Sequence, residues 1–187
     1  MFLLNILHTM EQNAWHSVSI GEGSPEVVSA IIEITKGSKG KFELDKDSGL
    51  IKLDRVLFSA VHYPTNYGFI PQTYCEDGDP LDILVLTTVD LPPLCLVEAK
   101  VIGVMGMIDG GEGDDKIIAV AKDDVNMKHI NELEDLPEHT LAEIKQFFEE
   151  YKKLEKKSVE VKGFEGKKRA LEVVQESIAL YQKTFAK

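Results

Sequence analysis

Apolar residues recur with the period of β-strands through the first two thirds of the chain. Residues 27–34 are almost continuously apolar, whereas residues 41–44 alternate polar and apolar side chains, as a half-buried strand does. The polar segment 45–49 ends in glycine and precedes a further apolar stretch, which predicts a hairpin turn. The expected strands are residues 27–34, 41–44, 50–58, 82–86, 94–108 and 117–121.

Beyond about residue 135 the apolar residues follow a helical period instead. One stripe is formed by Leu141, Ile144, Phe147, Phe148, Tyr151 and Leu154. Asp135, Pro137 and Glu138 are suited to the start of that helix. Residues 168–185 form a second amphipathic pattern, and Gly163 and Gly166 interrupt the chain between the two. The pattern therefore predicts strands followed by a helical C-terminal part.

Composition limits the classes of partner. The 187 residues are expected to form one domain, and the formal net charge of −11 disfavours nucleic acid and anionic membranes as partners. Cys75 and Cys95 fit no zinc-binding spacing, so we interpret them as reduced thiols, which points to a reducing compartment.

The N-terminal segment, residues 1–26, is interpreted as an arm. Its apolar start is interrupted by Asn5 and His8 and lacks a basic region, so it resembles neither a signal peptide nor a membrane span. Trp15 either packs against the core or docks on another chain, and packing is the favoured interpretation.

Three aspartates within six residues form the strongest chemical feature. Asp77 and Asp79 are two residues apart, Pro80 ends any extended geometry, and Asp82 opens an apolar strand. Carboxylates this close raise one another's pKa unless a cation lies between them. Mg²⁺ prefers oxygen ligands of this kind. The alternative is a solvated acidic turn before a strand.

Further candidates stand elsewhere in the chain. The loop 109–116 is acidic and separates two expected strands, so a barrel would bring it to the same mouth as the first acidic motif. Glu33 interrupts an apolar strand and is either a functional carboxylate or an outward-facing side chain. Tyr63 and Tyr67 either hydrogen-bond a phosphate or a metal-bound water, or belong to the core. Tyr151 and the adjacent Lys152 are interpreted from the pattern as a core tyrosine and a surface lysine.

The segment 77–83 resembles, at every position, the motif of the family I soluble inorganic pyrophosphatases. Other blocks resemble the family in the same order: residues 31–34, 41–43, 54–55, 63–68, 109–116 and 147–152. The resemblance covers roughly residues 14–165. It implies an α+β, mainly β fold, with a five-stranded OB-like barrel, flanking α-helices and a polar cavity at the barrel mouth. The first 13 residues extend beyond the shorter bacterial enzymes.

The resemblance also implies residue roles. Asp77, Asp82, Asp109 and Asp114 resemble metal ligands, and Asp79 resembles the general base. The residues that resemble ligands of pyrophosphate and phosphate are Lys41, Arg55, Tyr67, Lys116, Tyr151 and Lys152. Glu33, Glu43 and Tyr63 resemble supporting members of the site. Ser158 and Gly110 depart from the pattern, since many relatives carry Lys and Glu there.

The function expected from the resemblance is Mg²⁺-dependent hydrolysis of pyrophosphate to two phosphates, with Mn²⁺ or Zn²⁺ as substitutes. A cytoplasmic homo-oligomer is expected, with six chains favoured and Trp15 as a candidate contact. Two alternatives remain: a catalytically silent OB-like module that binds metal or phosphorylated ligands, and an acidic interaction protein whose loops are solvated.

Overall fold

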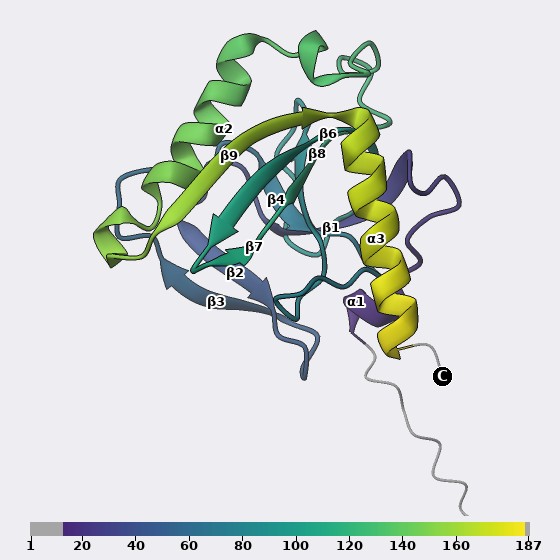
Figure 1. Ribbon diagram of the computed structural model, residues 1–187, viewed down its shortest axis with the longest axis horizontal. Helices are drawn as coiled ribbons and strands as arrows, with labels where there is room; N and C mark the ends of the chain where they lie inside the picture. The colour runs from purple at the N-terminus through teal and green to yellow at the C-terminus, as the bar shows by residue number, and fades with distance from the viewer. Residues whose placement is uncertain (1–12, 186–187) are drawn as a thin grey trace, which may run out of the picture.

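The computed structural model describes residues 13–185 (Figure 1). The strands are β1 (Val27–Ile34), β2 (Gly40–Leu44), β3 (Ile51–Val56), β4 (Asn66–Phe69), β5 (Asp82–Leu86), β6 (Leu96–Asp109), β7 (Glu112–Gly113), β8 (Lys116–Ala121) and β9 (Val159–Gly166). The helices are α1 (Ala14–Ser17), α2 (Glu138–Glu150) and α3 (Lys167–Phe185), with 3-10 turns η1 (Leu133–Asp135) and η2 (Lys153–Glu155).

Five of the strands close into a ring. The hydrogen-bonded order is β1-β4-β5-β8-β6, and β6 also pairs with β1, which closes the sheet on itself. Only the β5–β8 pairing is parallel within this ring. The mainly β, OB-like architecture expected from the sequence is confirmed.

The central strands read as continuous apolar runs because both of their faces are buried. Ile83 and Val85 of β5 pack in a cluster that includes Val173 and Val174 of α3. Leu84, between them, packs in another cluster with residues of α2. Successive side chains of a strand point to opposite faces, so each helix covers alternate residues. Figure 1 shows α2 and α3 on different sides of the ring.

The prediction that the whole C-terminal part is helical is wrong. Between α2 and α3 the chain forms β9, which pairs antiparallel with β6 from Gly103↔Gly166 to Asp109↔Val159. In this strand Gly163 adopts φ +137°, where other residues would be strained. The helix start is confirmed at Glu138, directly after Pro137, but Asp135 does not cap it and instead accepts hydrogen bonds from the Asn131 and Glu132 N–H groups beside η1.

Trp15 lies inside the described chain. It is 4% exposed, and its Nε1–H donates to the Thr73 carbonyl oxygen at 2.8 Å. Its ring packs edge-on against Phe185 of α3, at 5.4 Å between centroids. The favoured interpretation as a packing residue is confirmed, and little of the Trp15 side chain is left exposed for a contact with another chain.

The proposed N-terminal extension lies almost wholly outside the described residues. Within residues 13–185, none of the helices has the length and apolar character needed to cross a bilayer.

Candidate active site

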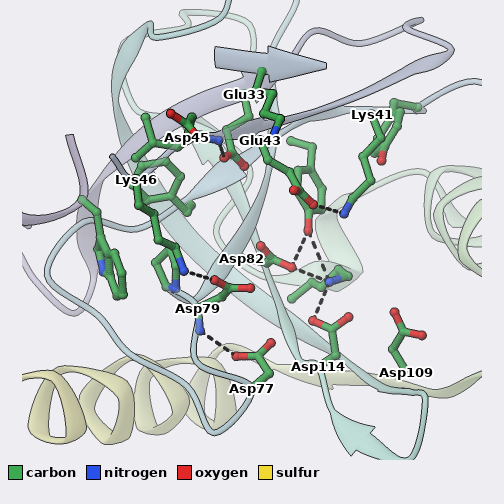
Figure 2. A pocket seen from close by; sticks show the side chains of 18 of the residues that line it. Glu33, Lys41, Glu43, Asp45, Lys46, Asp77, Asp79, Asp82, Asp109 and Asp114 are labelled. Carbon is green, nitrogen blue, oxygen red and sulfur yellow. Dashed lines mark hydrogen bonds and ion pairs between the residues drawn. The ribbon is translucent and has the colours of Figure 1, made fainter. Parts of the chain in front are cut away.

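A polar cavity of about 540 Å³ opens beside β2 and β5. Every predicted site residue except Arg55 lines it. Those residues are Glu33, Lys41, Glu43, Tyr63, Tyr67, Asp77, Asp79, Asp82, Asp109, Asp114, Lys116, Tyr151 and Lys152. The two acidic loops, far apart in the sequence, therefore meet at one cavity (Figure 2).

The first acidic loop is a tight turn between β4 and β5. The Cys75 N–H donates to the Asp79 carbonyl oxygen at 2.8 Å, and Gly78 takes φ +88°, a conformation that favours glycine. The Asp79 N–H donates to Asp77 Oδ1 at 3.1 Å. Burial raises the pKa of the Asp77 carboxyl above its ordinary value. The turn thus holds Asp77 and Asp79 at the cavity, with Asp82 fixed on the strand that follows.

Lys116 joins the two acidic loops. The parallel pairing of β5 with β8 places Asp82 opposite Lys116. The Lys116 ammonium is 2% exposed and lies 2.5 Å from Asp82 Oδ2 and 2.8 Å from Asp114 Oδ1. Burial alone would lower the pKa of Lys116, but the Asp82 and Asp114 carboxylates raise it above its ordinary value. Lys116 is therefore a permanent cation on the cavity wall.

Asp82 is the carboxylate most constrained by its surroundings. Burial raises the pKa of Asp82 to about 6, against the lowering effect of Lys116. The Tyr67 hydroxyl donates to Asp82 Oδ2. Because burial also raises the pKa of Tyr67, the phenol stays protonated and remains a donor. Tyr67 is thus both a core residue and a polar member of the site.

Tyr151 and Lys152, the two residues that follow α2, also line the cavity. The Lys152 ammonium pairs with Asp109 of the second acidic loop. Tyr151 stacks on Phe147 at 5.4 Å between centroids, and burial raises the pKa of its hydroxyl. The interpretation of Tyr151 as a core tyrosine is confirmed for its ring, while the residue also lines the cavity. The Lys152 side chain is 12% exposed and ion-paired, so its interpretation as a surface lysine is wrong.

Glu33 is buried, so the outward-facing alternative is wrong. Its side chain accepts a hydrogen bond from the Leu44 N–H at 2.6 Å, which links β1 to β2. Burial raises the pKa of Glu33 to about 8. Glu33 is therefore a neutral carboxyl near pH 7, on a strand whose other side chains are nearly all apolar.

Arg55 differs from the expectation. Its Nε donates to Glu155 Oε1 at 2.9 Å and its Nη1 to Asp54 Oδ2 at 2.5 Å, so the guanidinium is held at the edge of the site. Its Nη2 is buried and has no partner among the described residues. Arg55 nevertheless pairs across the hairpin with Lys41, which does line the cavity.

Some cavity residues were missed by the sequence analysis. Lys46 and Lys52, both on the β2–β3 hairpin, line the cavity together with Trp15 and Phe148. Lys46 lies in a polar turn and Lys52 in an alternating strand, so neither stood out from ordinary surface lysines. Their common signal was a position on the same hairpin as Lys41.

The donor set suits a hard divalent cation, although no metal centre is assembled among residues 13–185. The four carboxylates that resemble metal ligands face one cavity and supply the oxygen atoms that Mg²⁺ prefers. Lysines cross-link most of them: Lys116 with Asp82 and Asp114, and Lys152 with Asp109. The residue types therefore fit Mg²⁺. The lysine ammonium groups paired with these carboxylates show that the negative charge of the carboxylates is balanced by positive charge in this structure.

The fold and cavity together define an OB-like protein whose site combines carboxylates with lysine and tyrosine side chains. Residues 30–182 match the model of the family described as inorganic pyrophosphatase. The chain therefore belongs to the inorganic pyrophosphatase family, as its motifs predicted.

Individual proteins similar to this chain support the family assignment. Soluble inorganic pyrophosphatase 1 of Arabidopsis thaliana is 53% identical over 167 residues, which cover 89% of this chain and 79% of the relative. Soluble inorganic pyrophosphatase 2 of Chlamydomonas reinhardtii is 53% identical over 171 residues, 91% of this chain and 89% of the relative. The crystal structure of the Thermus thermophilus inorganic pyrophosphatase superposes with a TM-score of 0.87 at 47% identity, covering 90% of this chain and 98% of that one.

Proposed function

We propose that the protein hydrolyses inorganic pyrophosphate to two phosphates and so draws pyrophosphate-releasing biosynthetic reactions forward. The observation that carries this proposal is the meeting of two acidic loops with Lys41, Lys116 and Lys152 in one cavity. Hydrolysis of a phosphoric anhydride needs both a site that activates water and cations that neutralise phosphate oxygens. The similarity to named inorganic pyrophosphatases over most of the chain supports the substrate.

Asp79 is the proposed general base. Its side chain is about 60% exposed and lines the cavity, so it is accessible to solvent water. Asp82 is less suited to that role, because its side chain is only 21% exposed and its carboxylate is bonded to both Lys116 and Tyr67. A base that accepts the proton of the attacking water is worth about 10²–10⁴ in rate.

The substrate ligands are lysine, arginine and tyrosine side chains. Lys41, Lys116 and Lys152 present ammonium groups, and the Tyr67 and Tyr151 hydroxyls stay protonated as donors. Arg55 would turn its unpaired Nη2 toward a phosphate from the cavity edge. These cations allow a chain of net charge −11 to bind a polyanion.

Asp77, Asp82, Asp109 and Asp114 would hold Mg²⁺, with Mn²⁺ or Zn²⁺ as substitutes. When bound, such ions supply charge neutralisation on the phosphate oxygens and lower the pKa of water at the site. Glu33, Glu43 and Tyr63 are supporting residues of the site. Glu43 pairs with Lys41, and Glu33 accepts a hydrogen bond from the Leu44 N–H, which fixes the backbone there. We further propose that the enzyme acts in the cytoplasm as a homo-oligomer, with six chains favoured.

The test is phosphate release from pyrophosphate with Mg²⁺ and with excess chelator. We expect turnover with Mg²⁺ and loss of turnover in the chelator. Binding of pyrophosphate without release of phosphate would instead identify a silent OB-like module. Absence of both binding and release would favour the acidic interaction protein, and full turnover in the chelator would contradict the metal requirement.

A further inference from the structure

Lys46 links the β2–β3 hairpin to the first acidic loop at the cavity. It lies at the turn between β2 and β3, and its side chain reaches across to the first acidic loop, where the ammonium pairs with the Asp79 carboxylate (Figure 2). The same ammonium lies 3.3 Å from the Gly78 carbonyl oxygen. It also lies 4.8 Å from the centroid of the Trp15 ring, within the range of a cation–π contact.

The N-terminal segment holds this lysine in place. Asn13 Nδ2–H donates to the Lys46 carbonyl oxygen at 2.9 Å, which ties the hairpin turn to α1. Trp15 Nε1–H donates to the Thr73 carbonyl oxygen, and the Gln72 N–H donates to the Trp15 carbonyl oxygen at 2.9 Å. One short segment thus fixes both Lys46 and the chain that leads into the acidic loop.

Stability does not explain this arrangement. The side chains of Lys46 and Asp79 are 42% and 60% exposed, and exposed ion pairs contribute little to folding. What the contact does provide is orientation, because Lys46 is the only side-chain partner of the Asp79 carboxylate among the described residues. Without it, an exposed side chain on a turn would sample several rotamers.

We propose that Lys46 is a positioning residue for pyrophosphate hydrolysis, which holds the Asp79 carboxylate toward the cavity. This inference rests on the proposed function and on Asp79 as the base. Lys46 acts through Asp79 and need not touch the substrate. A misplacement of about 1 Å at a reacting group can cost about 10²-fold in rate. A side chain that orients an exposed base can therefore have a large effect on the rate.

Lys52 provides a matched control. It lies on the same hairpin, lines the same cavity and forms no ion pair among the described residues. Lys52→Met removes one positive charge from the cavity without touching Asp79. If Lys46 contributed only positive charge, Lys46→Met and Lys52→Met would have the same kinetic effect.

The experiment measures kcat and KM for pyrophosphate with saturating Mg²⁺ in Lys46→Met, Lys46→Arg and Lys52→Met, each with Asp79 and with Asp79→Asn. We expect Lys46→Met to lower kcat by about 10- to 100-fold with KM little changed. Lys46→Arg should restore most of that loss, because a guanidinium also pairs with a carboxylate. With Asp79→Asn there is no base to orient, so Lys46→Met should have no further effect.

Several results would overturn the inference. They are an undiminished kcat in Lys46→Met, an equal loss with and without Asp79→Asn, or a change confined to KM that matches Lys52→Met. Thermal unfolding of each variant guards against a general loss of structure, and the low cost of exposed pairs predicts nearly unchanged midpoints. Failure of the proposed function is distinguishable, since the wild-type protein itself would then release no phosphate.

Discussion

At the residue scale, burial decides the charge of the cavity's acids. Glu33 is 7% exposed, receives one hydrogen bond from the Leu44 N–H, and has its pKa raised to about 8 by burial. The unfolded chain releases this proton near pH 4.5, whereas the folded chain keeps it to about pH 8. The folded state therefore binds the extra proton between these values.

Glu33 should make the protein less stable as pH rises. Its contribution is fully present below about pH 4.5 and is lost as pH rises through about 8, the reverse of an ion-paired acid. Glu33→Gln, which stays neutral, should remove this decline. The measurement is the free energy of unfolding in urea from pH 5 to 9, in chelator so that metals do not shift the equilibrium. Parallel profiles for the two proteins would refute the assignment.

Asp79 and Asp82 should respond differently to the same substitution. Asp79→Asn should keep metal binding and lower the rate by about 10²–10⁴, and higher pH should recover part of it because hydroxide replaces the missing base. Asp82→Asn should instead weaken metal binding, so excess Mg²⁺ should restore part of the activity. The measurement is rate against pH and against Mg²⁺ concentration for both variants.

Each variant serves as the control for the other, since they exchange the same groups three residues apart. If both depend on pH and on Mg²⁺ alike, the separate roles are wrong even if the protein hydrolyses pyrophosphate. Full rescue of Asp79→Asn by metal would make Asp79 a ligand instead of a base.

The site residues that could be predicted from the sequence are those that form a motif within a few consecutive residues. Asp77, Asp79 and Asp82 form a compact motif, and the structure places all three on the cavity. The direction of Arg55 could not be predicted, because it depends on Glu155, which lies 100 residues away in the chain. The position of Lys46 across from Asp79 likewise depends on how a hairpin packs against a distant loop.

At the element scale, Gly68 allows β1 and β4 to approach closely. A Cβ at this position would lie 1.9 Å from the Ile31 carbonyl oxygen, which is backbone and cannot rotate away. Strands β1 and β4 are neighbours in the closed ring, so moving them apart would also strain the other strand pairings of the ring.

We therefore expect Gly68→Ala to destabilise the protein by about 3 kcal/mol, the upper range for overpacking. Gly166→Ala is the matched control, because a Cβ there meets no atom within 4 Å. Chemical unfolding of both variants tests the prediction. A Gly68→Ala variant as stable as Gly166→Ala would contradict the close approach.

Strands β1, β5, β6 and β8 of the ring were predictable because their apolar runs are separated by turn residues. Strand β4 was not expected, because its four residues, Asn66–Phe69, lie in an aromatic, turn-rich stretch without an apolar run. Strand β9 was missed although Val159, Val161 and Phe164 have partly buried side chains against the core. Its register shifts beside Gly106 and Met107 of the partner strand β6, and its glycines resemble a break between helices. Pairing with β6, a long-range interaction, decides the strand there.

At the scale of the whole molecule, the apolar side chains left exposed bear on assembly. Leu50, Leu53, Val56 and Phe58, on or beside β3, are 65%, 51%, 53% and 63% exposed. Trp15, by contrast, is only 4% exposed within its own chain. The outer edge of the β2–β3 hairpin is therefore a better candidate for contact between copies than the N-terminal segment.

We predict that the wild-type protein is an oligomer, with six chains favoured, and that Leu53→Asp with Phe58→Asp lowers its mass. A charge at each position would be desolvated in an apolar contact but is harmless on a free surface. Val125→Asp, at a side chain that is 72% exposed elsewhere, should leave the mass unchanged. Light scattering at micromolar concentration measures all three proteins. A monomeric wild type would refute assembly, and an unchanged mass in the double variant would place the contact on another surface.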